Sequence, residues 1–198
     1  MPVRKIVVIG TESTGRSTLC EGLAAHFHTD WVPEYAREYL LAHGKQYEYE
    51  DLLKIAKGQL VLEDTHTDKL RRKQVSQGMT GSSRPGNLST ENSLTGPMLF
   101  IDTDLYVMKV WSEFVYGKCD PWILDQIALR KYDCYLLCRT DLPWAPDELR
   151  EYPDLVTRET LFHIYKDCLI NQGTPWVEIG GSEELRLQNA VDALSRLL

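Results

Sequence analysis

Apolar residues gather in short uninterrupted runs that are separated by longer amphipathic segments. The runs are residues 6–9 (IVVI), 98–101 (MLFI), 134–138 (CYLLC) and 176–179 (WVEI), and Trp31-Val32 is a shorter candidate. The first three runs show no alternation with polar residues, which is typical of strands in a parallel sheet that helices cover on both faces. We therefore expect the strands of the sheet at these positions.

Between these runs, apolar residues recur every three or four positions, which is the period of a helix with one buried face. The stripes are Leu19, Leu23 and Phe27; Val107, Val110, Trp111 and Phe114; Leu161, Ile164, Tyr165 and Cys168; and Leu187, Ala190, Val191, Leu194 and Leu198. Strands that alternate with helices in this way predict an α/β fold whose sheet is mostly parallel.

One segment, residues 74–97 (QVSQGMTGSSRPGNLSTENSLTGP), departs from this pattern. It is rich in small and polar residues and contains few large apolar ones, so it cannot bury enough surface to offset the entropy of ordering it. We expect a disordered insertion here, within a single domain that spans residues 1–198.

The composition argues against several classes of protein. The chain has 22 Lys and Arg against 29 Asp and Glu, a net charge of −7, whereas binding to nucleic-acid backbones draws on clustered positive charge. No apolar run is long enough for a membrane span or a signal peptide. The five cysteines are odd in number and scattered, as is typical of reduced thiols. We therefore expect a cytoplasmic protein with a small-molecule substrate and no nucleic-acid or membrane partner, while its oligomeric state stays open.

The strongest chemical signal is residues 10–18, GTESTGRST, which directly follow the first predicted strand and open a predicted helix. They match the phosphate-loop pattern G-x-x-x-x-G-K-[ST] at every fixed position except Arg16, where lysine is usual. Successive backbone N–H groups and the positive end of the helix dipole bind phosphate in such loops. The residues expected to bind nucleotide are Gly10, Glu12, Ser13, Thr14, Gly15, Arg16, Ser17 and Thr18.

Arg16 leaves two functions open. Arginine is longer, planar and forked, so it can hold phosphate but not from the place that lysine occupies. We therefore expect nucleotide binding to survive the change more readily than phosphoryl transfer. Either the chain is a kinase with a reduced rate, or it is a nucleotide-binding regulator with little turnover.

Acidic residues follow two of the predicted strands. Asp102 ends the run at 98–101, and with the Ser17 hydroxyl it is expected to hold Mg²⁺; Asp104 is expected at the same edge, near the substrate. Glu34 follows Trp31-Val32, at the carboxyl edge where ligands bind in open α/β sheets. There it can accept the proton of an attacking sugar hydroxyl or bind the substrate by a hydrogen bond to the ribose, and Arg37 can orient it or hold the substrate.

Four stretches in this order resemble the ribosylnicotinamide kinases of the NadR type and their AAA-domain relatives. They are GTESTGRSTL, VPEYAREYL (residues 32–40), LFIDTD (99–104) and LPWAPDELREYPD (142–154). The resemblance implies a P-loop, nucleoside-kinase-like fold with a lid. It also implies transfer of the γ-phosphoryl group of ATP, with Mg²⁺, to the 5′-hydroxyl of nicotinamide riboside, which gives nicotinamide mononucleotide. Another nucleoside acceptor remains an alternative, and because no H-x-G-H motif occurs we expect no adenylyl transfer.

Residues 140–157, the lid segment, are rich in proline and acidic residues and are flanked by Arg139, Arg150 and Arg158. Arginines of a lid can neutralise the charge of a transferring phosphoryl group, so Arg150 and Arg158 are the candidates for this role. Three aromatic residues can stack on a flat cation such as a pyridinium ring, although core packing is open to each of them. They are Trp111, Tyr116 and Trp122.

Overall fold

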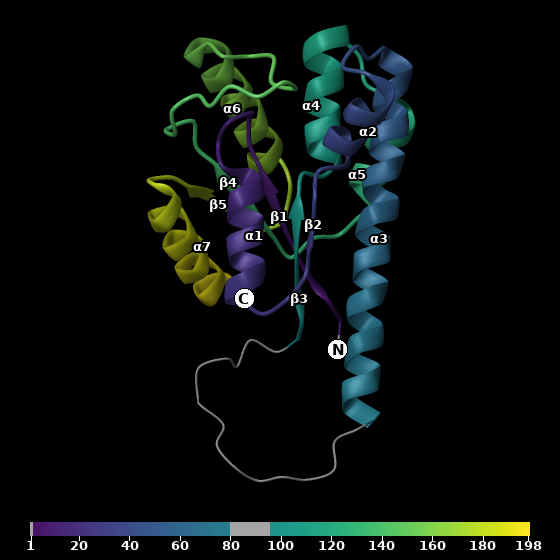
Figure 1. The fold of residues 1–198 in the computed structure, drawn as a ribbon, viewed down its shortest axis with the longest axis vertical. Coiled ribbons are helices and arrows are strands. Elements are labelled where there is room, and N and C mark those ends of the chain that lie inside the picture. The colour runs from purple at the N-terminus through teal and green to yellow at the C-terminus, as the bar shows by residue number, and fades with distance from the viewer. Residues whose placement is uncertain (1, 80–95) are drawn as a thin grey trace.

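The computed structural model describes residues 2–79 and 96–198, and its centre is one five-stranded sheet in which every pairing is parallel. The strand order is β2-β3-β1-β4-β5 (Figure 1). The strands are β1 (Arg4–Ile9), β2 (Trp31–Val32), β3 (Met98–Asp102), β4 (Cys134–Cys138) and β5 (Trp176–Ile179). The predicted α/β class and the predicted strand positions are confirmed.

The register of the sheet explains the uninterrupted apolar run of β1. Val7 pairs with Ile101 of β3 on one side and with Tyr135 of β4 on the other, so β1 is a central strand. Val7 belongs to a hydrophobic cluster on one face of the sheet, and its neighbour Val8 belongs to the cluster on the opposite face. Because both faces are covered by helices, neither face accepts polar side chains.

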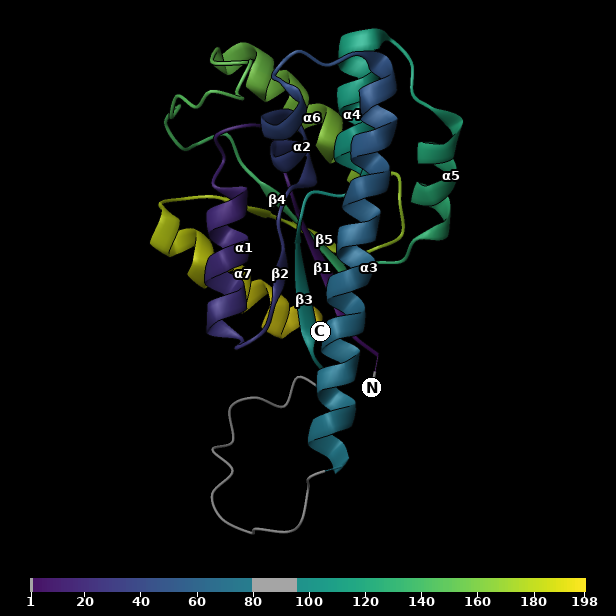
Figure 2. The same cartoon turned by 45° about the vertical axis from the view of Figure 1, so that its right-hand side comes forward.

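Helices form the two outer layers. They are α1 (Arg16–His26), α2 (Tyr35–His43), α3 (Tyr49–Met79), α4 (Leu105–Tyr116), α5 (Pro121–Leu129), α6 (Leu155–Ile170) and α7 (Glu183–Leu197). α1 and α7 cover one face of the sheet, whereas α3, α4 and α6 lie on the other (Figure 1). α2 packs on α3, and α5 packs on the outer side of α4 (Figure 2).

The predicted insertion at 74–97 is wrong at its first residues, because α3 continues through Met79. Elongation of an existing helix adds one hydrogen bond for each residue fixed, so a polar tail can extend a long helix that packing has already stabilised. Pro97, at the other end, is ordered beside β1, where its carbonyl accepts a hydrogen bond of 2.9 Å from the N–H of Arg4. The rest of this prediction, residues 80–95, lies outside the described residues.

Two findings bear on the expectations from composition. None of the helices described within residues 2–79 and 96–198 is both long and apolar enough to cross a membrane. The five cysteines are free thiols, and Cys20, Cys134 and Cys138 are buried in the core. They therefore serve as apolar side chains in the packing of the sheet.

Candidate active site

The candidate site lies at the carboxyl edge of the sheet. The phosphate loop follows β1, Glu34 follows β2, and Asp102 is the last residue of β3. Parallel strands bring these ends to one edge, where the three elements line a cavity of about 490 Å³. The predicted nucleotide-binding residues, all within residues 10–18, line this cavity together.

Two glycines give the phosphate loop its path. Gly10 has a φ of 151°, and a Cβ atom there would lie 2.9 Å from the carbonyl oxygen of Cys138. Gly15 is left-handed, with a φ of 74°, at the residue that precedes α1. Both positions disfavour a side chain, so the loop requires glycine where the motif has it.

Ser17 and Asp102 meet at the base of the cavity. The Ser17 hydroxyl donates a hydrogen bond of 2.5 Å to Oδ2 of Asp102. The other carboxylate oxygen, Oδ1, is buried and accepts no hydrogen bond from the described residues. Burial raises the pKa of Asp102, and Arg16 opposes that rise. A hydroxyl beside a carboxylate with a free oxygen is a donor set that suits Mg²⁺, which prefers oxygen ligands.

Arg16 does not extend along the loop but turns toward the acidic residues. Its Nη2 lies 3.4 Å from both carboxylate oxygens of Glu34, and its Nε lies 3.9 Å from Oδ1 of Asp102. Burial disfavours the charged guanidinium, but the two carboxylates outweigh burial and raise the pKa of Arg16. Its Nη1 is buried and has no hydrogen-bond partner among the described residues. Arg16 therefore stays charged, with one donor left over.

Glu34 is placed by the start of α2. It is the residue before the helix, a position from which short polar side chains often accept a hydrogen bond from the first turn. The Glu34 carboxylate makes no such bond within the described part of the chain. It faces Arg16 and the cavity instead.

The lid segment is held against the phosphate loop by side chains of the loop itself. Oε2 of Glu12 accepts hydrogen bonds from the backbone N–H groups of Glu151 (2.9 Å) and Tyr152 (3.1 Å). The Ser13 hydroxyl accepts another, of 2.9 Å, from the N–H of Ala145. Burial raises the pKa of Glu12, although the two backbone donors partly oppose this. Residues Glu12 and Ser13 of the phosphate loop therefore contact the lid segment directly.

The flanking arginines occupy three different environments. Arg150 lines the cavity, and its Nη1 lies 3.4 Å from the Ser13 hydroxyl. Arg158 is buried, and its Nη2 donates to the carbonyl of Ser13 at 3.2 Å. Arg139 is more than half exposed and pairs with Glu178 at 3.4 Å. Of these three side chains only that of Arg150 lines the cavity, and the catalytic role expected of Arg158 stays a prediction.

Aromatic side chains form part of the cavity wall. Of the three aromatic residues considered for stacking, Trp111 lines the cavity, whereas Tyr116 and Trp122 pack with α2 and α3. The Phe114 and Tyr152 rings, which also line the cavity, meet edge to face with centroids 5.5 Å apart. This wall can accept a flat ring, and it lies in the same cavity as Glu34.

A model of the AAA domain family matches residues 5–186. The chain belongs to this family. Over 177 residues this AAA domain is 25% identical to the trifunctional NAD biosynthesis/regulator protein NadR of Salmonella typhimurium, and equally to that of Escherichia coli. The matched region covers 89% of this chain but only 38% of either relative, so the chain spans less than two-fifths of their length.

Solved structures share the fold of this AAA domain. A crystal structure of NadR in complex with NR superposes with a TM-score of 0.70 at 21% identity, over 98% of this chain and 49% of that one. Thymidylate kinase from Ehrlichia chaffeensis superposes with a TM-score of 0.61 at 10% sequence identity, over 98% of this chain and 100% of that one. Deoxyadenosine kinase from M. mycoides superposes with a TM-score of 0.57 at 13% sequence identity, over 97% of this chain and 99% of that one. The predicted P-loop fold and the resemblance to the NadR-type domain are confirmed.

Two residues predicted to bind substrate have other partners in this AAA domain. Arg37 lines the cavity but forms a bidentate pair with Asp147 of the lid segment, with both distances at 3.0 Å. Asp104 is buried. Its carboxylate accepts a hydrogen bond of 3.0 Å from the N–H of Tyr106, which caps α4, and one of 2.7 Å from the hydroxyl of Tyr135. Burial raises the pKa of Asp104 to about 7. These contacts hold the Asp104 carboxylate at the start of α4, and its expected place near the substrate stays a prediction.

Residues that the sequence did not single out complete the site. Tyr165 of α6 and Leu149 of the lid segment line the cavity, and Asp147 holds Arg37. The apolar stripe of α6 was assigned wholly to the core, since periodicity alone does not distinguish a cavity wall from packed interior. The acidic residues of the lid carried no spacing signal, because their partner is more than a hundred positions away.

Proposed function

We propose that this AAA domain is an ATP-dependent kinase that phosphorylates the 5′-hydroxyl of nicotinamide riboside. The observation that carries the proposal is a single cavity lined by the phosphate loop, the Glu34 carboxylate and an aromatic wall. A phosphate donor and a flat nucleoside can therefore be bound side by side. The similarity to NadR, whose solved structures include complexes with NR and with NAD and AMP-PNP, supports this choice of ligands.

In the proposed reaction Glu34 acts as the general base. It accepts the proton of the 5′-hydroxyl as that oxygen bonds to the γ-phosphorus, while the bond from phosphorus to the bridging oxygen of ADP breaks. Ser17 and Asp102 would hold Mg²⁺, which supplies positive charge for the phosphates when bound. Arg150, beside the Ser13 hydroxyl, would offset the charge on the transferring group.

Arg16 supports a second candidate, a nucleotide-binding regulator with little turnover. Its guanidinium pairs with Glu34 and lies near Asp102, the two carboxylates on which the proposed transfer depends. A carboxylate that is held in an ion pair is less free to approach the hydroxyl of an acceptor. The regulator would therefore bind nucleotide at the same loop and transfer phosphate slowly.

One experiment separates these functions from a kinase for a different nucleoside. Transfer from γ-labelled ATP would be measured in single turnovers with nicotinamide riboside, deoxyadenosine and thymidine, with the wild type and with Arg16→Lys. We expect labelled product chiefly with nicotinamide riboside, and a transfer rate about a hundredfold lower with Glu34→Gln. Transfer to another nucleoside would contradict the choice of acceptor. Tight nucleotide binding without transfer by either form would favour the regulator.

A further inference from the structure

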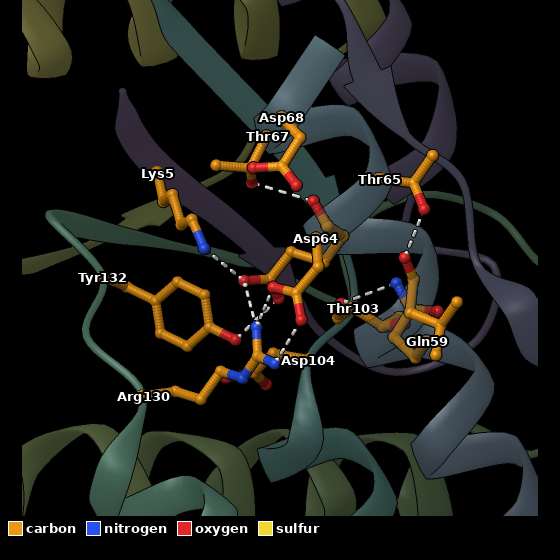
Figure 3. A network of polar contacts seen from close by, with 12 residues as sticks. Lys5, Gln59, Asp64, Thr65, Thr67, Asp68, Thr103, Asp104, Arg130 and Tyr132 are labelled. Carbon is orange, nitrogen blue, oxygen red and sulfur yellow. Dashed lines mark hydrogen bonds and ion pairs between the residues drawn. The ribbon is translucent and has the colours of Figure 1, made fainter. Parts of the chain in front are cut away.

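Gln59 of α3 is a buried polar side chain that lies outside the cavity but contacts the backbone on which the cavity is built. Only 2% of the residue is exposed. Its amide lies beside the ends of β2 and β3, and Figure 3 shows it next to Thr103. The proposed reaction uses neither its oxygen nor its nitrogen, so its burial needs another explanation.

The hydrogen bonds of Gln59 join the two segments that carry the candidate carboxylates. Its Oε1 accepts 2.7 Å from the N–H of Tyr35, and its Nε2 lies 3.4 Å from the carbonyl oxygen of Pro33. These residues flank Glu34. The same Nε2 lies 3.5 Å from the carbonyl of Asp102 and 3.3 Å from that of Thr103. The orientation of the amide is fixed by its partners, because an N–H needs an acceptor and carbonyls need a donor.

Two backbone features show that this junction is demanding. The Tyr35 ring occupies the space above Gly58, where a Cβ atom would lie 1.9 Å from its Cε1. Thr103 has a φ of 71°, an uncommon conformation for a β-branched residue, directly after Asp102. The amide nitrogen of Gln59 lies within hydrogen-bond distance of the carbonyl oxygens of Asp102 and Thr103. Two neighbouring residues of α3 therefore meet Tyr35: Gly58 leaves room for its ring, and the amide of Gln59 bonds to its N–H.

We propose that Gln59 is a positioning residue that sets Glu34 relative to Asp102. The inference rests on the proposed function, since it concerns the base and the carboxylate of the proposed transfer. An apolar side chain of the same length would fill the space but remove the acceptor of the Tyr35 N–H and the amide donor beside the three carbonyls. The end of β2 would then be free to shift against the end of β3. A base displaced from the reacting hydroxyl loses rate in the chemical step while the phosphate loop still binds nucleotide.

The test compares Gln59→Met with Thr67→Val. Thr67 is also a buried polar residue of α3, but its hydroxyl donates 2.8 Å to the carbonyl of Glu63 within the helix. We expect Gln59→Met to lower the single-turnover rate on the order of tenfold with an unchanged dissociation constant for Mg²⁺-ADP. Thr67→Val is expected to leave both unchanged. In a Glu34→Gln background the further loss caused by Gln59→Met should shrink, because coupled residues are not additive.

A second measurement needs no activity and no variant. The N–H of Tyr35 lies in the first turn of α2, where amides lack partners within the helix, so without Gln59 it would exchange rapidly with solvent. We expect it to be protected in the wild type, unlike the N–H of Arg37. Rapid exchange at Tyr35, or a wild-type transfer rate in Gln59→Met, would overturn the inference. A wild type that transfers no phosphate would overturn the proposed function, and protection at Tyr35 would still decide the role of Gln59.

Discussion

Arg16 and Glu34 form an ion pair across the candidate site, with Nη2 of the guanidinium 3.4 Å from both carboxylate oxygens. The pair connects the first residue of α1 to the residue that precedes α2. It also ties the residue at which the phosphate loop departs from its usual pattern to the proposed general base. The arginine therefore affects the acceptor side of the cavity as well as the phosphate side.

Arg16→Lys is expected to raise the single-turnover transfer rate to nicotinamide riboside about tenfold or more, which corresponds to at least ~1.4 kcal/mol of barrier. Either side chain carries one positive charge, so the affinity for ATP should change little. A lysine lacks the forked guanidinium that pairs with both oxygens of Glu34, so it can reach the phosphates and leaves the proposed base less constrained. Rates and dissociation constants would be measured together. Equal rates in the two forms would show that arginine is a working substitute and would remove the support for the regulator.

Mg²⁺-ADP is expected to raise the melting temperature of the domain. A ligand at a hundred times its dissociation constant adds about 2.7 kcal/mol to the stability of a protein that binds it only when folded. Removal of Mg²⁺ with a chelator, or Ser17→Ala, should reduce this shift. Ser195→Ala is the matched control, because that hydroxyl bonds within α7. A melting temperature that does not move with nucleotide would contradict a phosphate-binding role for residues 10–18.

Glu63 and Asp64, neighbours on α3, should differ widely in their contribution to stability. Glu63 is fully buried and pairs with Lys5 at 2.7 Å and with Arg130 at 3.2 Å. Its other oxygen accepts 2.9 Å from Tyr132. Figure 3 shows Lys5, Arg130 and Tyr132 converging on this helix. Loss of one partner of a buried pair strands the remaining charge, so Glu63→Ala should lower the free energy of unfolding by about 3–5 kcal/mol.

Asp64 provides the comparison on the same helix. It forms an ion pair of 2.6 Å with Arg130, but its side chain is 55% exposed, and exposed pairs contribute about 1 kcal/mol or less. Asp64→Ala should therefore have a small effect in the same urea titration. Similar losses for the two variants would contradict the assignment of the buried network to Glu63.

Stability should depend on pH through Glu12. Its pKa is raised in the folded domain, so the folded state holds this proton at pH values where the unfolded chain has released it. The contribution is therefore present below the ordinary glutamate pKa of ~4.3 and is lost as pH rises through the folded pKa. Glu12→Gln keeps an oxygen for the N–H groups of Glu151 and Tyr152 but cannot titrate.

The free energy of unfolding of Glu12→Gln, relative to that of the wild type, should accordingly increase as pH rises from ~4 to ~7. Glu148→Gln serves as the control, because Glu148 is an exposed lid residue that pairs with Lys45. Urea titrations across this range would measure both differences. A difference that decreases with pH would reverse the sign assigned to Glu12.

The sequence predicted the sheet well because a strand that is buried on both faces appears as an uninterrupted apolar run. The run at Ile6–Ile9 lies within β1, which extends back to Arg4 since strand ends tolerate polar side chains. It also predicted that the phosphate loop, Glu34 and Asp102 would meet, because parallel strands share a carboxyl edge. What it could not predict was the partner of each side chain at that edge.

Contacts between distant residues account for the misses. The turn of Arg16 toward Glu34, the pairing of Arg37 with Asp147 and the burial of Asp104 all depend on how helices settle against the sheet. No local spacing encodes such contacts, since the pairs are separated by as many as 110 positions. The last turns of α3 were missed for a different reason. Their polar composition is typical of a loop, but a helix that is already formed extends into such residues at little cost.

The parallel sheet separates the candidate site from the end of its longest helix, α3. α3 ends at Met79 and β3 begins at Met98, at the amino end of that strand, whereas Asp102 and the phosphate loop lie at the carboxyl end (Figure 1). The end of α3 and the start of β3 are therefore separated from Glu34 and Asp102 by the length of the sheet. For the same reason, a fluorescent label attached to the last turns of α3 would report on that end of the domain without touching the cavity.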